Sequence, residues 1–188
     1  MKLSWSQKLF LQINSLVGKS KWRDRFMFFC AQYLIYVLIF LVLWVGIIIL
    51  PAPNFKDMIK LLMTALAFDV AISWLLATVW EHKRPIVELA EVKELLKPMQ
   101  VWKSFPSDHT SISFIFALIG ILSGCSLIWV VIFILIASLI AFSRIYVGVH
   151  YPRDIVGGII FAIVFVFLSF ELLENVTQPL YNYFINLF

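Results

Sequence analysis

The run from Phe26 to Leu50 contains no charged side chain and ends at two prolines, Pro51 and Pro53. A helix needs about 20 apolar residues to cross a bilayer, and proline stops helices. The whole chain is 62% apolar and 14% charged, whereas soluble proteins are about half apolar and about a quarter charged. The sequence therefore predicts an all-α integral membrane protein.

Four more apolar segments follow, and each has the length and composition of a transmembrane helix. They cover about residues 58–80, 107–124, 127–147 and 154–173. We therefore expect about five transmembrane helices in a single membrane-embedded domain, residues 1–188. The alternative is an additional span hidden in the N-terminal region.

Three further segments are expected at the membrane surface. Residues 1–22 carry apolar side chains near helical spacing with lysines between them, which predicts an amphipathic helix; a disordered tail is the alternative. The long polar stretch 81–106 contains leucines that favour a short interfacial helix, and a second interfacial piece, 175–188, closes the chain.

The polar residues able to do chemistry gather on one side of the membrane. Spans in series place the loop 81–106 and the loop near residue 150 on the same side, and all three histidines lie there. Ionisable groups at membrane depth are costly, so such a cluster indicates a functional site. The set consists of His82, Lys83, Arg84, Ser107, Asp108, His109, Arg144, His150, Arg153 and Asp154.

The start of the third span, from Pro106 to His109, predicts an anion site. Ser107 or Asp108 can cap this helix. The first turn of a helix also offers free backbone N–H groups and a partial positive charge. An ordinary capped helix accounts for the serine and the aspartate, but not for His109.

His150 and Asp154 are four residues apart, so they share one face if the fifth helix begins near His150. A carboxylate that accepts a hydrogen bond from one ring nitrogen leaves the other nitrogen nucleophilic. Pro152 suits the first turn of that helix, where no N–H is needed. A purely structural pair at a helix start is the alternative.

Arg84 and Arg144 supply fixed positive charge whose geometry matches a phosphate; snorkelling to lipid headgroups is the alternative. The net charge of +4 comes from basic residues that interrupt apolar runs. This pattern indicates a membrane surface or an anionic substrate, and no nucleic acid. Cys30 and Cys125 have no second cysteine or histidine at metal spacing, so no zinc site is predicted.

Together these residues resemble the type 2 phosphatidic acid phosphatase superfamily. Its third motif is Ser-Arg, five residues, His, three residues and Asp, and it is complete from Ser143 to Asp154. Its second motif, Pro-Ser-Gly-His, reads Pro-Ser-Asp-His at 106–109. Its first motif, Lys, six residues and Arg-Pro, keeps only Arg84 and Pro85. The resemblance covers about residues 77–154 and implies the helical bundle of that family.

Two departures from the family pattern concern the phosphate site. Ala77 stands where the family has its lysine, and Lys83 or His82 could supply the missing charge from the loop. Asp108 replaces the usual glycine, and its carboxylate should repel a phosphate unless it is paired or points away. Both departures resemble the branch of bacterial undecaprenyl-diphosphate phosphatases.

The resemblance implies a hydrolase that needs neither a metal nor another cofactor. His150, oriented by Asp154, would attack phosphorus and form a phosphohistidine, and His109 would protonate the leaving oxygen. The substrate would be undecaprenyl diphosphate, cleaved to undecaprenyl phosphate and phosphate to recycle the lipid carrier for cell-wall synthesis. The ligands of its phosphate would be Arg84, Ser107, Arg144 and Lys83.

Two other functions fit the same pattern. One is a phosphatase of glycerolipid monophosphates such as phosphatidate or phosphatidylglycerophosphate. The other is a non-catalytic transporter or scaffold, in which Asp69 would be an ion or proton site instead of a carboxyl group buried and hydrogen-bonded between helices.

The orientation in a bacterial cell membrane has two conflicting indications. The resemblance implies a site that faces outward, which is our expectation. Every basic residue except Lys56 and Lys60 lies on the site side if the N-terminus does too, and such a bias normally marks the cytoplasmic side. The sequence does not indicate an oligomeric state.

Overall fold

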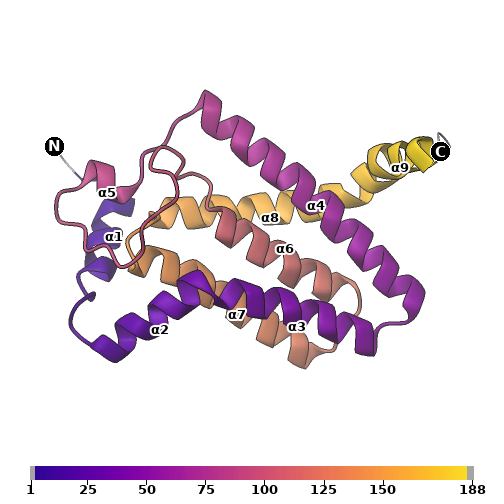
Figure 1. The fold of residues 1–188 in the computed structure, drawn as a ribbon, viewed down its shortest axis with the longest axis horizontal. Coiled ribbons are helices and arrows are strands. Elements are labelled where there is room, and N and C mark those ends of the chain that lie inside the picture. Colours follow the sequence, from indigo (N-terminus) through magenta and orange to yellow (C-terminus); the bar gives the residue numbers. More distant parts are fainter. Residues whose placement is uncertain (1–2, 186–188) are drawn as a thin grey trace.

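A computed structural model describes residues 3–185, and it folds them into a helical bundle (Figure 1). Apart from one isolated β-bridge, the regular elements of these residues are helices, as predicted. Their bounds are α1 Trp5–Asn14, α2 Lys21–Gln32, α3 Leu34–Ile49, α4 Ala52–Val79, α5 Pro85–Glu88, α6 Asp108–Leu122, α7 Leu127–Tyr146, α8 Pro152–Leu172, a π-helical turn Leu173–Thr177 and α9 Gln178–Ile185.

The predicted spans correspond to the α2–α3 pair, α4, α6, α7 and α8. Of the described helices, α4, α7 and the continuous segment Pro152–Tyr183 are long and apolar enough to cross a membrane. The pair α2–α3 reaches that length together, although it is bent by 53°. Helix α6 has 15 residues and is therefore about 22 Å long, short of the ~30 Å hydrocarbon core. It lies at the centre of the bundle and packs against α3, α4, α7 and α8.

The outer surface of the bundle is apolar, which is the expected solution when the solvent is lipid. Phe40 of α3, Leu135 of α7 and Phe167 of α8 are each more than 60% exposed. A water-soluble protein rarely exposes apolar side chains over so many elements. The exposed faces of these helices therefore fit the hydrocarbon part of a bilayer.

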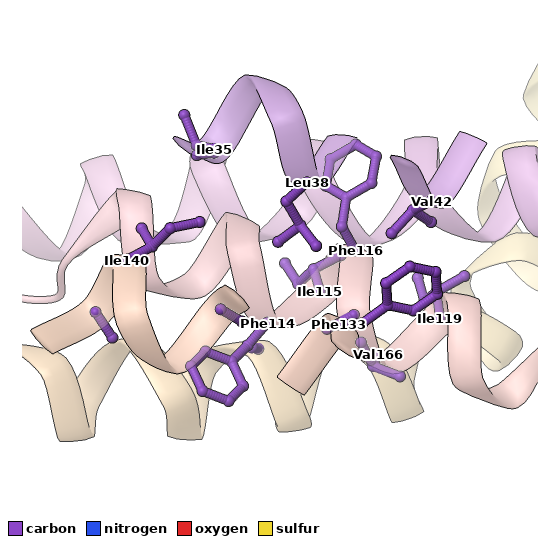
Figure 2. Packing of buried hydrophobic residues seen from close by; sticks show 14 of the residues in the cluster. Ile35, Leu38, Val42, Phe114, Ile115, Phe116, Ile119, Phe133, Ile140 and Val166 are labelled. Carbon is purple, nitrogen blue, oxygen red and sulfur yellow. The ribbon is translucent and has the colours of Figure 1, made fainter. Parts of the chain in front are cut away.

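Inside the bundle, α3, α6, α7 and α8 share one apolar core. Figure 2 shows Leu38 and Val42 of α3 beside Ile115 and Ile119 of α6, with Phe133 of α7 completing the cluster. These side chains are almost completely buried. They hold α6 at a fixed depth, so the residues at its start have a defined position.

The N-terminal segment differs from the prediction of one surface helix over residues 1–22. Residues 1–2 lie outside the described part, α1 ends at Asn14, and Gly18 turns the chain with a φ of 84°. Helix α2 then begins before the predicted start of the first span. Helix α1 is also no free surface helix, because Phe10 and Asn14 are buried against the loops at the site end.

The loop between α4 and α6 corrects a second prediction. Its only helix is the four-residue α5, so the expected interfacial helix through the leucines at 89, 95 and 96 is absent among these described residues. Instead, the two ends of the loop pair. Ser104 N donates to His82 O over 2.8 Å, and Arg84 N donates to Val101 O over 3.0 Å.

The C-terminal segment corrects a third prediction. Helix α8 continues through the π-helical turn into α9, and no break separates an interfacial piece from the fifth span. Figure 1 shows α9 as the extension of α8 at the end of the molecule opposite the long loop. Of the predicted piece 175–188, residues 186–188 lie outside the described part of the chain.

Close packing of α8 on α6 brings two of the sequence motifs together. A Cβ on Gly158 would lie 2.8 Å from the Ser107 carbonyl oxygen and 2.9 Å from Thr110 Cβ. Only glycine allows this approach. Ser107 N therefore donates to the Asp154 carbonyl over 3.1 Å, which fixes the start of α6 against the start of α8.

Candidate active site

A cavity of about 510 Å³ lies between the long loop and the ends of the helices. One part of its wall carries both predicted arginines and two of the histidines, and another part is apolar. Its lining residues are Gln32, Ile35, Tyr36, Ile39, Trp74, Arg84, Leu96, Lys97, Pro98, Met99, Gln100, Asp108, His109, Ile112, Arg144 and His150. The structure thus brings together residues that the sequence separates widely.

His150 sits in the short link between α7 and α8 and is 3% exposed. Its Nε2 lies 3.2 Å from Nη1 of Arg84. A guanidinium can only donate, so Nε2 must be the acceptor in this contact and carries no proton. The ring proton is then on Nδ1, which faces Asp154 Oδ2 at 3.6 Å.

The charge state of His150 follows from its surroundings. Burial, reinforced by the positive charge of Arg84, lowers the pKa of His150 to about 4, although the nearby Asp154 carboxylate works in the opposite direction. The ring is therefore neutral at pH 7. A neutral imidazole with an unprotonated Nε2 beside the cavity is a competent nucleophile.

Asp154 is fully buried in the first turn of α8. Its Oδ2 accepts hydrogen bonds from Ser104 Oγ at 2.6 Å and from Tyr151 N at 2.8 Å. The 3.6 Å separation from the imidazole is longer than a hydrogen bond. Asp154 is thus close to His150, as predicted, but its position is set by Ser104, a residue that the sequence analysis missed.

Arg84 and Arg144 both line the cavity, and each donates a side-chain hydrogen bond to a backbone carbonyl. Arg84 Nη1 donates to Val149 O over 2.8 Å, and Arg144 Nη1 donates to Ala31 O over 2.7 Å. The buried Nε atoms of both arginines have no partner. Burial lowers the pKa of Arg84, and the carboxylates of Asp154 and Asp108 counteract that effect. Buried, partly unpaired guanidinium groups are suited to an anionic ligand.

Only part of the predicted anion site at the start of α6 lies at the cavity. His109 lines the cavity, and the first-turn N–H groups of Asp108 and His109 have no helical carbonyl to bond. Ser107, in contrast, is fully buried and outside the cavity lining. Its Oγ accepts from Thr110 Oγ1 at 3.0 Å and makes no capping bond.

The residues considered as substitutes for the family lysine do not reach the cavity. Ala77 is buried in α4. Lys83 is exposed and lies outside the cavity lining. His82 packs against the rings of Trp80 and Phe105, with centroids 4.4 and 5.5 Å away.

A different lysine is buried at the site. Lys103 is 3% exposed, and its Nζ binds Asp108 Oδ1. The same oxygen accepts from Ser73 Oγ at 2.8 Å, so Asp108 is paired. Nothing in the sequence separates Lys103 from the exposed Lys93 and Lys97 of the same loop, so only the structure could identify it.

Asp69 is buried between helices, in keeping with one of the two interpretations of the sequence. It is fully buried in α4, and its Oδ2 accepts from Ser111 Oγ of α6 at 2.9 Å. Ser111 Oγ also lies 3.2 Å from the Asp108 carbonyl. Asp69 thus connects α4 to the first turns of α6.

Helix α1 supports the loop that carries His150. The Phe10 ring packs edge-on against Tyr151, with centroids 5.3 Å apart, and the Tyr151 hydroxyl donates to Glu88 Oε2 over 2.8 Å. Asn14 Nδ2 donates to Lys93 O at 2.9 Å and to Tyr146 O at 3.0 Å, and Asn14 Oδ1 accepts from Lys93 N. The sequence analysis missed this support, because these partners are distant along the chain.

Within the part of the chain that the structure describes, no three His, Cys, Asp or Glu side chains are placed to hold a metal ion. Cys30 is buried, and Cys125 lies in the α6–α7 turn. The positive charge that faces the cavity comes from Arg84, Arg144 and Lys97.

Comparison with known proteins gives a consistent set of relatives. The sequence model of the PAP2 superfamily matches residues 59–178. The chain is 30% identical to the undecaprenyl-diphosphatase BcrC of Bacillus subtilis over 166 residues, which are 87% of this chain and 82% of BcrC. It is 33% identical over 158 residues to YbjG of Escherichia coli, whose name gives the same activity provisionally; the match covers 81% of this chain and 74% of YbjG.

The fold also matches a solved structure. The crystal structure of LpxE from Aquifex aeolicus superimposes with a TM-score of 0.74 at 30% sequence identity. The match covers 90% of this chain and 97% of that one.

Proposed function

Because this chain belongs to the PAP2 superfamily of membrane lipid phosphatases, we propose that it hydrolyses undecaprenyl diphosphate to undecaprenyl phosphate and phosphate. The relatives that share about 30% of its residues over most of their length support this substrate. The observation that carries the proposal is the neutral His150, whose Nε2 lies 3.2 Å from Arg84 at the edge of a cationic cavity.

Binding of the terminal phosphate is the first step. Arg84 and Arg144, which both line the cavity, donate guanidinium N–H groups to its oxygens, and the first-turn N–H groups of α6 add further donors. Such preorganised donors stabilise the charge that spreads over the phosphoryl oxygens in the transition state. Ser107 acts through the backbone of this turn, and we assign no contact to the exposed Lys83.

The chemistry then proceeds in two displacements. His150 Nε2 attacks the terminal phosphorus, and the bond from phosphorus to the bridging oxygen breaks. His109, which takes up a proton when the anionic diphosphate binds beside it, gives this proton to that oxygen as undecaprenyl phosphate leaves. Water next attacks the phosphohistidine, its proton passes to His109, and phosphate is released with His150 neutral again. Asp154 stabilises the imidazolium character that His150 acquires during the first step.

The apolar part of the cavity provides a route for the lipid chain. Ile35 and Ile39 of α3 face it together with Ile112 of α6 and Trp74 of α4. A prenyl chain that follows this wall stays in an apolar environment while its diphosphate reaches the arginines. The polar chemistry therefore takes place where the bundle meets the headgroup region.

Phosphate release from undecaprenyl diphosphate by detergent-purified protein, with a chelator present, tests this function. The expected result is metal-independent release that the His150→Ala variant lacks. Release from phosphatidate or phosphatidylglycerophosphate alone would replace the substrate and keep the mechanism. No release from any of these lipids would overturn the proposal.

We also propose that the site faces outward from a bacterial cell membrane. The native Cys125 lies in the turn at the opposite end, whereas Cys30 is buried. In intact cells, a membrane-impermeant maleimide should leave Cys125 unlabelled until the membrane is permeabilised. Labelling of intact cells would place the site in the cytoplasm.

A further inference from the structure

Lys103 and Asp108 form an ion pair at the edge of the cavity, in which the lysine is buried and the aspartate is partly exposed. The two side chains approach closely through Nζ and Oδ1, and their exposed fractions are 3% and 34%. Ser73 Oγ donates to the same Asp108 oxygen over 2.8 Å. Asp108 lines the cavity, but Lys103 does not.

The position of Asp108 raises an electrostatic difficulty for an anion site. Its carboxylate faces the space where the phosphate binds, and it is close enough to favour the charged form of Arg84. An unpaired carboxylate there would repel the phosphate and weaken the field of the arginine. Because the Asp108 side chain is only 34% exposed, this repulsion would be stronger than at a fully exposed surface.

Lys103 is held where its ammonium group can neutralise the Asp108 carboxylate. The pairing of the two loop ends brings residue 103 beside residue 82, and the same pairing positions Arg84 and Ser104. The Trp74 ring lies 5.5 Å from Nζ and favours an ammonium group at this place. A lysine is almost never fully buried without such partners.

We propose that Lys103 is a positioning residue that neutralises Asp108 and holds it at the start of α6, so that the cavity accepts a phosphate. This inference rests on the proposed function for the identity of the anion. Lys103 acts through Asp108 and makes no direct contact with the phosphate. Ser73 donates a hydrogen bond to Asp108, and the Trp74 ring lies beside the Lys103 ammonium group.

A double-mutant cycle with Lys103→Met and Asp108→Asn tests the proposal. The readouts are the KM for undecaprenyl diphosphate, kcat, and the affinity for inorganic phosphate from its effect on thermal unfolding. Lys103→Met should weaken phosphate binding about tenfold, and KM should change more than kcat, because one unpaired charge acts on ground-state binding. Lys103→Met with Asp108→Asn should return phosphate binding to within about threefold of the parent.

The exposed pair Lys60 and Asp57, 3.9 Å apart at the other end of α4, is the matched control. Lys60→Met with Asp57→Asn should leave all readouts unchanged. Phosphate binding by Lys103→Met within twofold of the parent would overturn the proposal. A double variant as weak as Lys103→Met would also overturn it, because Lys103 would then bind the phosphate itself.

Two measurements keep the test decisive. If Lys103→Met does not fold, Asp108→Asn alone decides, since it should bind phosphate as tightly as the parent or more tightly; weaker binding would contradict the proposal. If the parent hydrolyses no lipid, the proposed function fails, but the thermal shift with inorganic phosphate still reports on the ion pair.

Discussion

Charged side chains are exposed at one end of the bundle, whereas several are buried at the other. At the end formed by the α3–α4 and α6–α7 connections, Lys60 and Asp57 are 49% and 67% exposed and 3.9 Å apart. At the site end, Arg144, Lys103 and Asp154 are buried, and each contacts at least one polar partner. An exposed pair contributes about 0–1 kcal/mol to stability, whereas a buried charge has a large desolvation cost.

This difference in burial points to a functional demand at the site end. Stability alone does not require buried arginines with unpaired Nε atoms. An anionic ligand in the cavity would supply a counter-charge for Arg84 and Arg144. Matched substitutions at the two ends therefore test whether the buried charges at the site end serve catalysis.

The largest difference between the ends is expected for the nucleophile. His150→Ala should lower kcat by about 10⁴-fold or more, because no other group can form the covalent intermediate. Cys125→Ala in the opposite turn should retain full activity. Phosphate release measured for both variants checks this, and an active His150→Ala would remove His150 from the mechanism.

Loss of an arginine should have the next largest effect. Arg144→Gln should lower kcat/KM by about 10²–10³-fold, because it removes a buried donor to the transferring phosphoryl group. The control Lys60→Gln should stay within twofold. Steady-state kinetics separate the two ends, and equal effects would show that burial at the site end has no catalytic role.

Asp154→Asn should cost less, about 10–100-fold in kcat, because Asp154 orients His150 and forms no bond to the substrate. The hydrogen bonds from Ser104 and Tyr151 allow an amide oxygen to keep its place. Asp57→Asn is the control. A loss as complete as that of His150→Ala would mean that Asp154 takes part in the chemistry itself.

The pH dependence should report on the environment of His150. Its pKa is lowered to about 4, so the nucleophile is neutral above that pH and kcat/KM should fall as the pH drops through about 4. Arg84→Gln removes a positive charge that lowers this pKa, so the acidic limb should move to higher pH. The pH profile of kcat/KM for residual activity measures the shift, and an unmoved limb would contradict it.

The smallest effect on activity is expected away from the cavity. Asn14→Ala leaves buried backbone groups of Lys93 and Tyr146 without partners, which should lower the free energy of unfolding by about 1–3 kcal/mol. The control is Asn175→Ala, since Asn175 is exposed. Thermal unfolding in detergent compares the two, and equal stability would show that α1 does not support the site.

Much of the fold follows from local pattern. Charge-free runs and prolines predicted the membrane helices, and their alternation placed the histidines on one side. The bounds failed where tertiary contacts override local pattern. Helix α1 is short and docked because Phe10 packs on Tyr151, and residues 89–96 stay non-helical because Leu95 N bonds to Val147 O over 3.1 Å.

The candidate site also contains some residues that the sequence pattern indicated and others that it did not. The i,i+4 spacing of His150 and Asp154 indicated their proximity, because helical geometry converts spacing into distance. The guess that Lys83 replaces the family lysine has no support in the structure, which places Lys83 on the surface. The buried lysine beside the cavity is Lys103, which has no motif of its own.

A bundle of apolar helices with polar residues at one end follows from the sequence alone, because these features depend on composition, periodicity and the order of the spans. In contrast, the folded structure was needed to show which lysine pairs with Asp108, which serine binds Asp154 and which helix supports the loop that carries His150. Ser104 and Asp154 are 50 residues apart in sequence, and Asn14 and Tyr146 are 132 apart. Contacts at such separations depend on how whole helices and loops pack, so a local sequence pattern does not predict them.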